Sequence, residues 1–250
     1  MNKELAPSGK LRIGLNYSNF LLVLGDDADG EPRGIAPDLG RELARRVGLP
    51  FEYVKFDAAG KLFDAVKSAA CDVGFLGAEP QRASEVEFTE AYLEIPVTFL
   101  VPAGSPIRQI ADVDREGVRV AVSERSAYDL YLSRTFKKAR LVRTKGIPAS
   151  YDAFIAQKLE ALGGLKPKLV EEQARTPGSR VLDGQITGVQ QAIGAPKGRE
   201  AAAKYLREFA QLVHRLGPRR DVDRLELHAE ARQELLHLDA ARAARPPVHA

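Results

Sequence analysis

Helix-like and strand-like patterns alternate along residues 34–106, and this alternation constrains the fold more than any other feature. Apolar residues recur every four positions from Ile35 to Val47, as they do on the buried face of a helix. A nearly continuous apolar run then covers residues 71–77, as expected of a strand buried on both faces of a parallel sheet. The alternation predicts an α/β fold in which the carboxyl ends of the strands gather at one edge.

The alternation restarts beyond a Pro-Ala-Gly-Ser-Pro cluster at residues 102–106, which has the composition of a linker. The sequence therefore predicts two Rossmann-like lobes. Residues 11–101 together with 187–217 would form a discontinuous lobe 1, and residues 106–186 an inserted lobe 2. Within lobe 2 we expect a helix over residues 150–161.

Two crossings of the chain would connect the lobes and act as a two-strand hinge. They are predicted at residues 102–106 and 187–191. Gly163-Gly164 is expected to interrupt the regular pattern of lobe 2. Residues 218–250 differ from the rest in composition, and we expect them to form a divergent helical tail.

Composition and charge exclude several classes of protein. The 37 basic and 34 acidic side chains leave a net charge of only +3 and form no long basic block, so nucleic-acid binding is not expected. No apolar stretch reaches the roughly 18 residues of a membrane span, so direct insertion into a membrane is not expected. The first ten residues lack the apolar segment of a signal peptide. We therefore expect either that a signal peptide was removed or that the protein works in the cytoplasm.

Cysteine and histidine give no indication of a metal site. Cys71 is the only cysteine, so an internal disulfide is excluded, and its apolar surroundings predict a buried structural thiol. His228 and His237 are nine residues apart, whereas a metal site on one helix face needs a spacing of three or four. We expect no metal and no cofactor.

Arg82 is the main candidate for ligand binding. It follows the predicted strand end at Gly77-Ala78 and a turn at Glu79, where open α/β sheets bind their ligands. Its guanidinium is always charged and matches a carboxylate with two parallel hydrogen bonds. The alternative is a surface ion pair with Glu79 or Glu85, which would contribute little to stability.

A predicted helix start at Ser126 would face Arg82 from lobe 2. Asp129 stands three residues further on, as a capping-box partner would. The free N–H groups of Ser126, Ala127 and Tyr128, together with the helix dipole, would favour an anion. The alternative is an ordinary helix cap.

Two polar segments supply the remaining candidates. The loop after the first strand contains Asn16, Tyr17 and Phe20, whose aromatic rings either stack on a ligand or pack into the core. The second crossing contains Gln190 and Gln191. Both segments would border a cleft between the lobes.

Several short motifs share their order and spacing with one known family. The chain resembles the family 3 extracellular solute-binding proteins, the polar amino acid receptors of ABC importers, over about residues 11–213. The resemblance implies their type II periplasmic-binding fold. The motifs are Gly34-Ile-Ala-Pro-Asp-Leu39, Asp72-Val-Gly-Phe75, Arg82 before Glu87-Phe-Thr-Glu-Ala-Tyr92, and Val101-Pro102.

By this resemblance Arg82 takes the position of the arginine that holds the α-carboxylate of the ligand. Ser126 and Ala127 fall at the family's ligand-binding helix start, and the Gln190-Gln191 segment aligns with the second hinge strand. Two positions depart from the pattern. Glu79 replaces a threonine, and Leu165 replaces the aspartate that grips the α-amino group, which argues against a standard α-amino acid as the ligand.

The resemblance implies a function in solute uptake without catalysis. The chain is expected to be a periplasmic monomer that captures a small carboxylate-bearing ligand, amino acid-like or an organic acid, for the permease of an ABC importer. A cytoplasmic ligand-sensing module is one alternative. The other is a dehydratase of the prephenate type on the same fold, with Glu79 as its general acid.

Overall fold

The chain is described by a computed structural model that covers residues 1–220, with side chains described as far as His214. The predicted tail at 218–250 lies outside this range from residue 221 onward, and so do His228 and His237. Among the residues described, no helix is long and apolar enough to cross a membrane.

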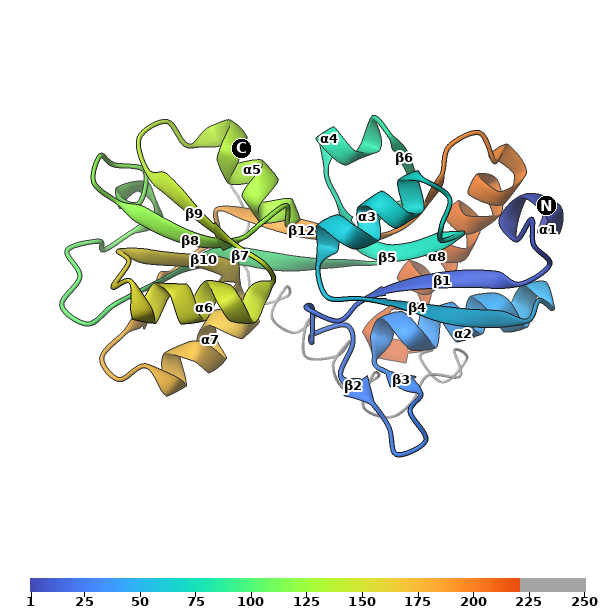
Figure 1. The fold of residues 1–250 in the computed structure, drawn as a ribbon, viewed down its shortest axis with the longest axis horizontal. Coiled ribbons are helices and arrows are strands. Elements are labelled where there is room, and N and C mark those ends of the chain that lie inside the picture. The colour runs from blue at the N-terminus through green and yellow to red at the C-terminus, as the bar shows by residue number, and fades with distance from the viewer. Residues whose placement is uncertain (221–250) are drawn as a thin grey trace.

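The two α/β lobes that the sequence predicts are present, and their strands join in one curled mixed sheet (Figure 1). In lobe 1, α2 and α3 lie on opposite faces of the sheet (Figure 1). This lobe contains the parallel strands β4 (Phe51–Phe56), β1 (Leu11–Asn16) and β5 (Val73–Ala78), the short strands β2 (Gly25–Asp26), β3 (Pro32–Arg33) and β6 (Val86–Phe88), and the helices α1 (Asn2–Leu5), α2 (Ile35–Val47), α3 (Ala59–Lys67), α4 (Pro80–Ala83) and α8 (Glu200–Arg220).

Lobe 2 repeats the architecture on a smaller scale. Three of its strands lie in the order β10-β8-β9 and are parallel, whereas the short β11 pairs antiparallel with β7. The lobe contains β8 (Arg119–Ser123), β9 (Arg140–Thr144), β10 (Ala161–Leu165), β11 (Arg180–Val181), the 3-10 turn η1 (Ile110–Asp112), and the helices α5 (Ala127–Thr135), α6 (Ile147–Ala156) and α7 (Lys166–Arg175).

Two long antiparallel strands, β7 (Leu93–Val101) and β12 (Thr187–Pro196), connect the lobes (Figure 1). β12 pairs with β5 of lobe 1 from Gln190 onward, and β7 pairs with β10 of lobe 2 from Val97 onward. The first crossing therefore lies inside β7, before the linker predicted at residues 102–106. The second crossing lies at residues 187–191, where β12 pairs with β7. The Pro-Gly cluster marks the end of the crossing strand rather than the crossing itself.

The predicted break at Gly163-Gly164 is wrong, because both glycines lie within the fully buried strand β10. A Cβ on Gly163 would lie 3.3 Å from Cε1 of Phe99 on the neighbouring strand, so glycine lets the two strands approach closely. The preceding helix, predicted over 150–161, is α6 and ends at Ala156. Paired glycines at a close approach of two strands have the same sequence pattern as a turn.

Candidate functional site

A cavity lies between the two lobes, where β5, α4 and the β1 loop face the start of α5. It is a narrow cavity of about 40 Å³ that opens to solvent. It brings together Arg82 of lobe 1 and the helix start at Ser126 of lobe 2, which are 44 residues apart in sequence. The lining residues are Asn16, Ser18, Asn19, Ala59, Leu76, Gly77, Arg82, Ser123, Ser126, Ala127, Tyr128, Ile147, Leu165, Val189 and Gln191.

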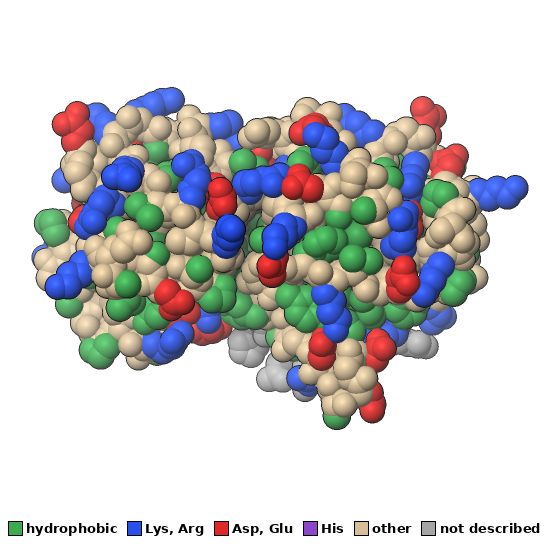
Figure 2. Space-filling model, viewed as in Figure 1, with side chains coloured by type: hydrophobic (Ala, Val, Ile, Leu, Met, Phe, Trp, Pro, Cys, Tyr) green, Lys and Arg blue, Asp and Glu red, His purple; other side chains and the backbone are tan. Residues whose placement is uncertain are grey.

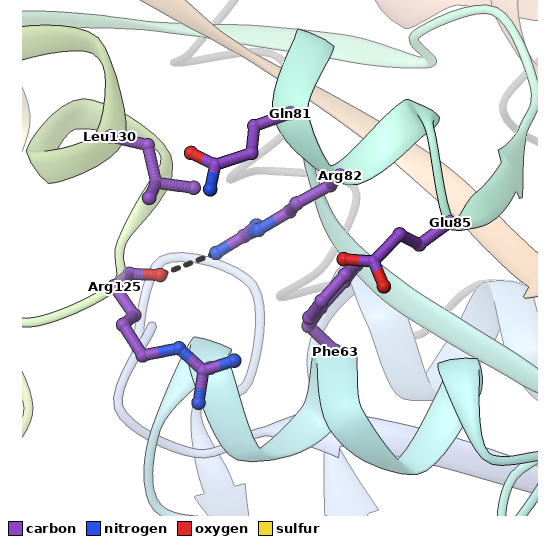
Figure 3. Close-up of a pocket in the computed structure, with 7 residues that line it drawn as sticks. Phe63, Gln81, Arg82, Glu85, Arg125 and Leu130 are labelled. Carbon is purple, nitrogen blue, oxygen red and sulfur yellow. Dashed lines mark hydrogen bonds between the residues drawn. The ribbon is translucent and has the colours of Figure 1, made fainter. Parts of the chain in front are cut away.

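Arg82 is buried between the lobes and connects them (Figure 3). Its side chain leaves α4 and is 3% exposed. Nη1 donates a hydrogen bond of 2.7 Å to the carbonyl of Gly77, and Nη2 donates one of 2.5 Å to the carbonyl of Arg125 in lobe 2. The centre of the Phe63 ring lies 5.6 Å from Cζ of Arg82. These contacts hold the guanidinium in one orientation at the wall of the cavity.

The charge of Arg82 is costly to bury, and an anion would compensate for it. Burial lowers the pKa of Arg82 to about 10, against an opposing effect of the nearby Glu79 carboxylate. The group is therefore still a cation at neutral pH. Its two backbone bonds use two of the five N–H groups of a guanidinium. The remaining donors suit a carboxylate or a similar planar anion.

Glu79 makes a contact that the sequence did not reveal. Its carboxylate pairs with Arg134 of α5 and also accepts a 2.9 Å hydrogen bond from the N–H of Gln81, which caps α4. Glu85 pairs with Lys67. Neither of the surface ion pairs considered for Arg82 is formed. Glu79 is thus held in a contact between the lobes instead of lining the cavity.

The helix start on lobe 2 has the cap that the sequence predicts, with one difference. The hydroxyl of Ser126 accepts a 3.1 Å bond from the N–H of Asp129, but the carboxylate of Asp129 accepts from the N–H of Arg125 rather than from that of Ser126. Helix geometry leaves the N–H groups of Ala127 and Tyr128 without partners inside α5. Both residues line the cavity, where the positive end of the helix dipole favours negative charge.

The other predicted site residues divide into two groups. Asn16 and Gln191 line the cavity, whereas Ala78 and Gln190 are not among its lining residues, and the side chain of Gln190 donates to Glu94. Tyr17 donates to Asp26 near the β2–β3 hairpin.

Phe20 lies at the boundary of the lobes, with Nζ of Lys168 from lobe 2 at 4.2 Å from the centre of its ring. Neither it nor Tyr17 lines the cavity itself.

Sequence reasoning missed Asn19 as a cavity residue. Asn19 is 6% exposed and its side-chain oxygen is buried without a hydrogen-bond partner. Its place in a polar loop after β1 was the available signal, but nothing in the pattern separated it from its neighbours. Leu165, noted only as a departure from a family pattern, also lines the cavity and is 4% exposed.

Ion pairs connect the lobes outside the cavity. Both terminal nitrogens of Arg125 donate to the carboxylate of Asp64, at 2.8 and 2.7 Å. This hydrogen bonding lowers the pKa of Asp64. Side chains of both signs gather where the lobes meet (Figure 2). Together with the contact between Arg134 and Glu79, these pairs hold the lobes against each other.

The described part of the chain offers no group of three or more His, Cys, Asp or Glu side chains arranged to hold a metal ion. Cys71 is buried, as predicted, and burial raises the pKa of its thiol to about 11. A thiol with a raised pKa is a poor nucleophile, which fits a structural role.

The matches to known proteins extend over both lobes. The profile described as "Bacterial extracellular solute-binding proteins, family 3" matches residues 11–217. A glutamine-binding protein of Geobacillus stearothermophilus is 21% identical over 208 residues, which are 82% of this chain and 79% of that protein.

Solved structures share the fold at low sequence identity. A solute receptor for L-cysteine of Neisseria gonorrhoeae superposes with a TM-score of 0.76 at 20% identity, covering 96% of this chain and 95% of the receptor. An ancestral amino acid-binding protein, described as a precursor of cyclohexadienyl dehydratase, superposes with a TM-score of 0.71 at 18% identity, covering 94% and 97%. Both likenesses extend over the two lobes and the strands between them.

Proposed function

This chain belongs to the bacterial extracellular solute-binding proteins, family 3, and from that premise we propose that it captures a small carboxylate-bearing solute between its lobes for an ABC importer. It would work outside the cytoplasmic membrane, as its family does, and present the closed complex to a permease. The glutamine-binding protein and the L-cysteine receptor among its relatives support a solute of amino acid size.

The observation that carries this proposal is the buried guanidinium of Arg82. A cation removed from water is costly unless an opposite charge is near. The two groups it contacts most closely are backbone carbonyls, which are only partial charges. A ligand carboxylate would complete the compensation, and the start of α5 would complement it from lobe 2.

The strands β7 and β12 support a hinge motion that admits the solute. They connect the lobes side by side, so a small rotation around residues 187–191 and the facing part of β7 would open the cavity. The bond from Arg82 to the carbonyl of Arg125 would break on opening. Closure would then coincide with assembly of the anion site.

The dehydratase alternative has weaker support. Its general acid would have been Glu79, but that carboxylate is bonded to Arg134 and to the N–H of Gln81. None of the side chains lining the cavity in the described region is an Asp or a Glu. A protein that only binds its solute needs no such general acid.

Isothermal titration with a library of amino acids and organic acids tests the proposal. We expect at least one carboxylate to bind the wild type, and we expect Arg82→Met to weaken it about a hundredfold, since truncating one partner of a buried charge pair costs about 2–5 kcal/mol. Arg108→Met is the matched control, because Arg108 is exposed and lines none of the cavities described. Equal affinity of Arg82→Met and wild type would refute the role of Arg82.

A further inference from the structure

The inner surface of the cavity is neutral apart from Arg82. Its other polar side chains are amides, hydroxyls and the phenol of Tyr128, from Asn16, Ser18, Asn19, Ser123, Ser126, Tyr128 and Gln191. No carboxylate lines it within the described residues. A solute with an ammonium group would therefore bring a cation into a buried space that already holds one and offers no negative partner.

The two carboxylates whose charges act on Arg82 are already bonded to other cations. Glu79 pairs with Arg134, and Asp64 pairs with Arg125. Turning either one toward a ligand would break a contact between the lobes.

Lobe 2 shows the same pattern in an adjoining pocket, which shares Tyr128, Ile147 and Leu165 with the cavity. Glu172 there is bonded to Lys168 at 3.1 Å and to Arg175 at 2.8 Å. Lys168 and Glu172 both line this pocket, and Lys168 also pairs with Glu171 at 2.8 Å. These carboxylates already have cationic partners, so an ammonium on the ligand would have to compete with Lys168 and Arg175 for Glu172.

Leu165 contributes an apolar surface to the wall of lobe 2 opposite Arg82. It is the last residue of β10 and the N-cap of α7, and its side chain makes no capping bond. Because Leu165 is buried, the polar end of a bound solute would lose water there without gaining a partner. The side of the solute that faces Leu165 must be uncharged.

Asn19 offers a neutral hydrogen bond instead. Its side-chain oxygen is buried, lacks a partner and belongs to a residue that lines the cavity. A hydroxyl is the smallest group that would donate to it without carrying charge into the site.

From these observations, and resting on the proposed function, we infer that the solute is a carboxylate that carries a hydroxyl in place of an ammonium group. The chemical class is a 2-hydroxy acid or a close analogue whose only charge is its carboxylate. Arg82 would bind the carboxylate, Asn19 would accept from the hydroxyl, and the apolar body would rest against Leu165.

Pairs of acids that differ only at the second carbon test this inference in a calorimeter. Suitable pairs are lactate and alanine, 2-hydroxyisocaproate and leucine, and phenyllactate and phenylalanine, each in both enantiomers. We expect the hydroxy acid of the best-binding pair to bind at least about tenfold more tightly, because an unpaired buried ammonium is rejected strongly. Lactamide and its analogues, which lack the carboxylate, should not bind.

Leu165→Asp and Leu165→Asn separate charge from polarity at the facing wall. Both residues are favoured at a helix N-cap, so α7 should tolerate either change, and circular dichroism checks the fold. Leu165→Asp should reverse the preference, with the amino acid gaining about tenfold and the hydroxy acid losing affinity through repulsion of its carboxylate. Leu165→Asn should leave the preference for the hydroxy acid in place.

The outcomes distinguish this inference from the proposed function. If an amino acid binds the wild type as tightly as its hydroxy partner or more tightly, and Arg82→Met abolishes that binding, the inference is overturned while the proposed function stands. If no acid of either series binds, or if Arg82→Met binds normally, the proposed function fails and the inference fails with it.

Discussion

The two walls of the cleft differ in how they are built. Lobe 1 supplies a full charge, Arg82, which is buried and held by hydrogen bonds at both terminal nitrogens. Lobe 2 supplies the start of α5 and the apolar side chain of Leu165. Two ion pairs outside the cavity connect the lobes, one between Arg134 and Glu79 and one between Arg125 and Asp64.

The difference suggests a division of labour between the lobes. A fixed charge provides most of the attraction for an anion, whichever anion it is. The neutral wall opposite determines which group the rest of the solute is allowed to carry. The two ion pairs outside the cavity affect how stable the closed arrangement of the lobes is. Each of these contributions can be perturbed separately.

Among variants at the contacts between the lobes, the largest effect is expected at Gly77. A Cβ on Gly77 would lie 2.6 Å from Cγ1 of Val189 and 3.0 Å from Cβ of Ala127 in lobe 2. Cβ of Ala127 cannot move without its backbone, and Val189 is a stiff, buried side chain. Gly77→Ala should hold the lobes apart and weaken binding about tenfold to a hundredfold, since overpacking costs about 1–3 kcal/mol. Titration measures the affinity, and small-angle scattering should show a more open protein.

Gly60→Ala is the matched control for this change. The new Cβ would lie 3.1 Å from Cβ of Arg125, a contact that a shift of about a few tenths of an ångström relieves, whereas the 2.6 Å contact at Gly77 is much tighter. Affinity close to wild type is expected. Equal losses in Gly60→Ala and Gly77→Ala would contradict the idea that rigid contact at Gly77 matters.

A smaller effect is expected at the buried ion pair between the lobes. Arg134→Met leaves the buried carboxylate of Glu79 without its partner and close to Arg82, where it would compete with the solute. We expect affinity to fall about tenfold, less than for a fully buried pair because Arg134 is partly exposed. Adding Glu79→Gln should restore most of the loss. A double variant as weak as Arg134→Met would rule out competition by the carboxylate.

The exposed ion pair should matter less. Asp64 and Arg125 are both about half exposed, so water and salt screen their attraction. Asp64→Asn should weaken ligand binding by no more than about threefold at low salt, and the difference should vanish at about 1 M salt, where the Debye length is about 3 Å. A loss as large as that of Arg134→Met would show that burial does not separate the two pairs.

The smallest effect is expected from pH below about 10. Burial depresses the pKa of Arg82, and only the protonated form attracts an anion, so affinity should be constant below that pKa and decline above it. With a pKa of about 10, half of the free protein loses the charge at that pH, which weakens binding about twofold. Titrations from pH 7 to 10.5, with circular dichroism to check folding, measure this. A decline centred near pH 8 would contradict it.

The sequence predicted the two-lobed fold because alternation of strands and helices is a local pattern. It also placed Arg82 and Ser126 at the cleft, since strand ends and helix starts can be located from local signals. It did not predict the pairing of Glu79 with Arg134, which joins residues 55 positions apart on different lobes. It wrongly predicted that Gly163-Gly164 interrupts the strand and helix pattern. Glycine at a turn and glycine beside a large neighbour such as Phe99 cannot be told apart in the sequence.

A crystal structure of the protein with its tightest-binding carboxylate tests the central claim most directly. The account predicts the carboxylate in the cavity between the lobes, within hydrogen-bond distance of the Arg82 guanidinium, with the uncharged part of the solute against Leu165. A solute bound elsewhere, or one whose carboxylate makes no contact with Arg82, would contradict it.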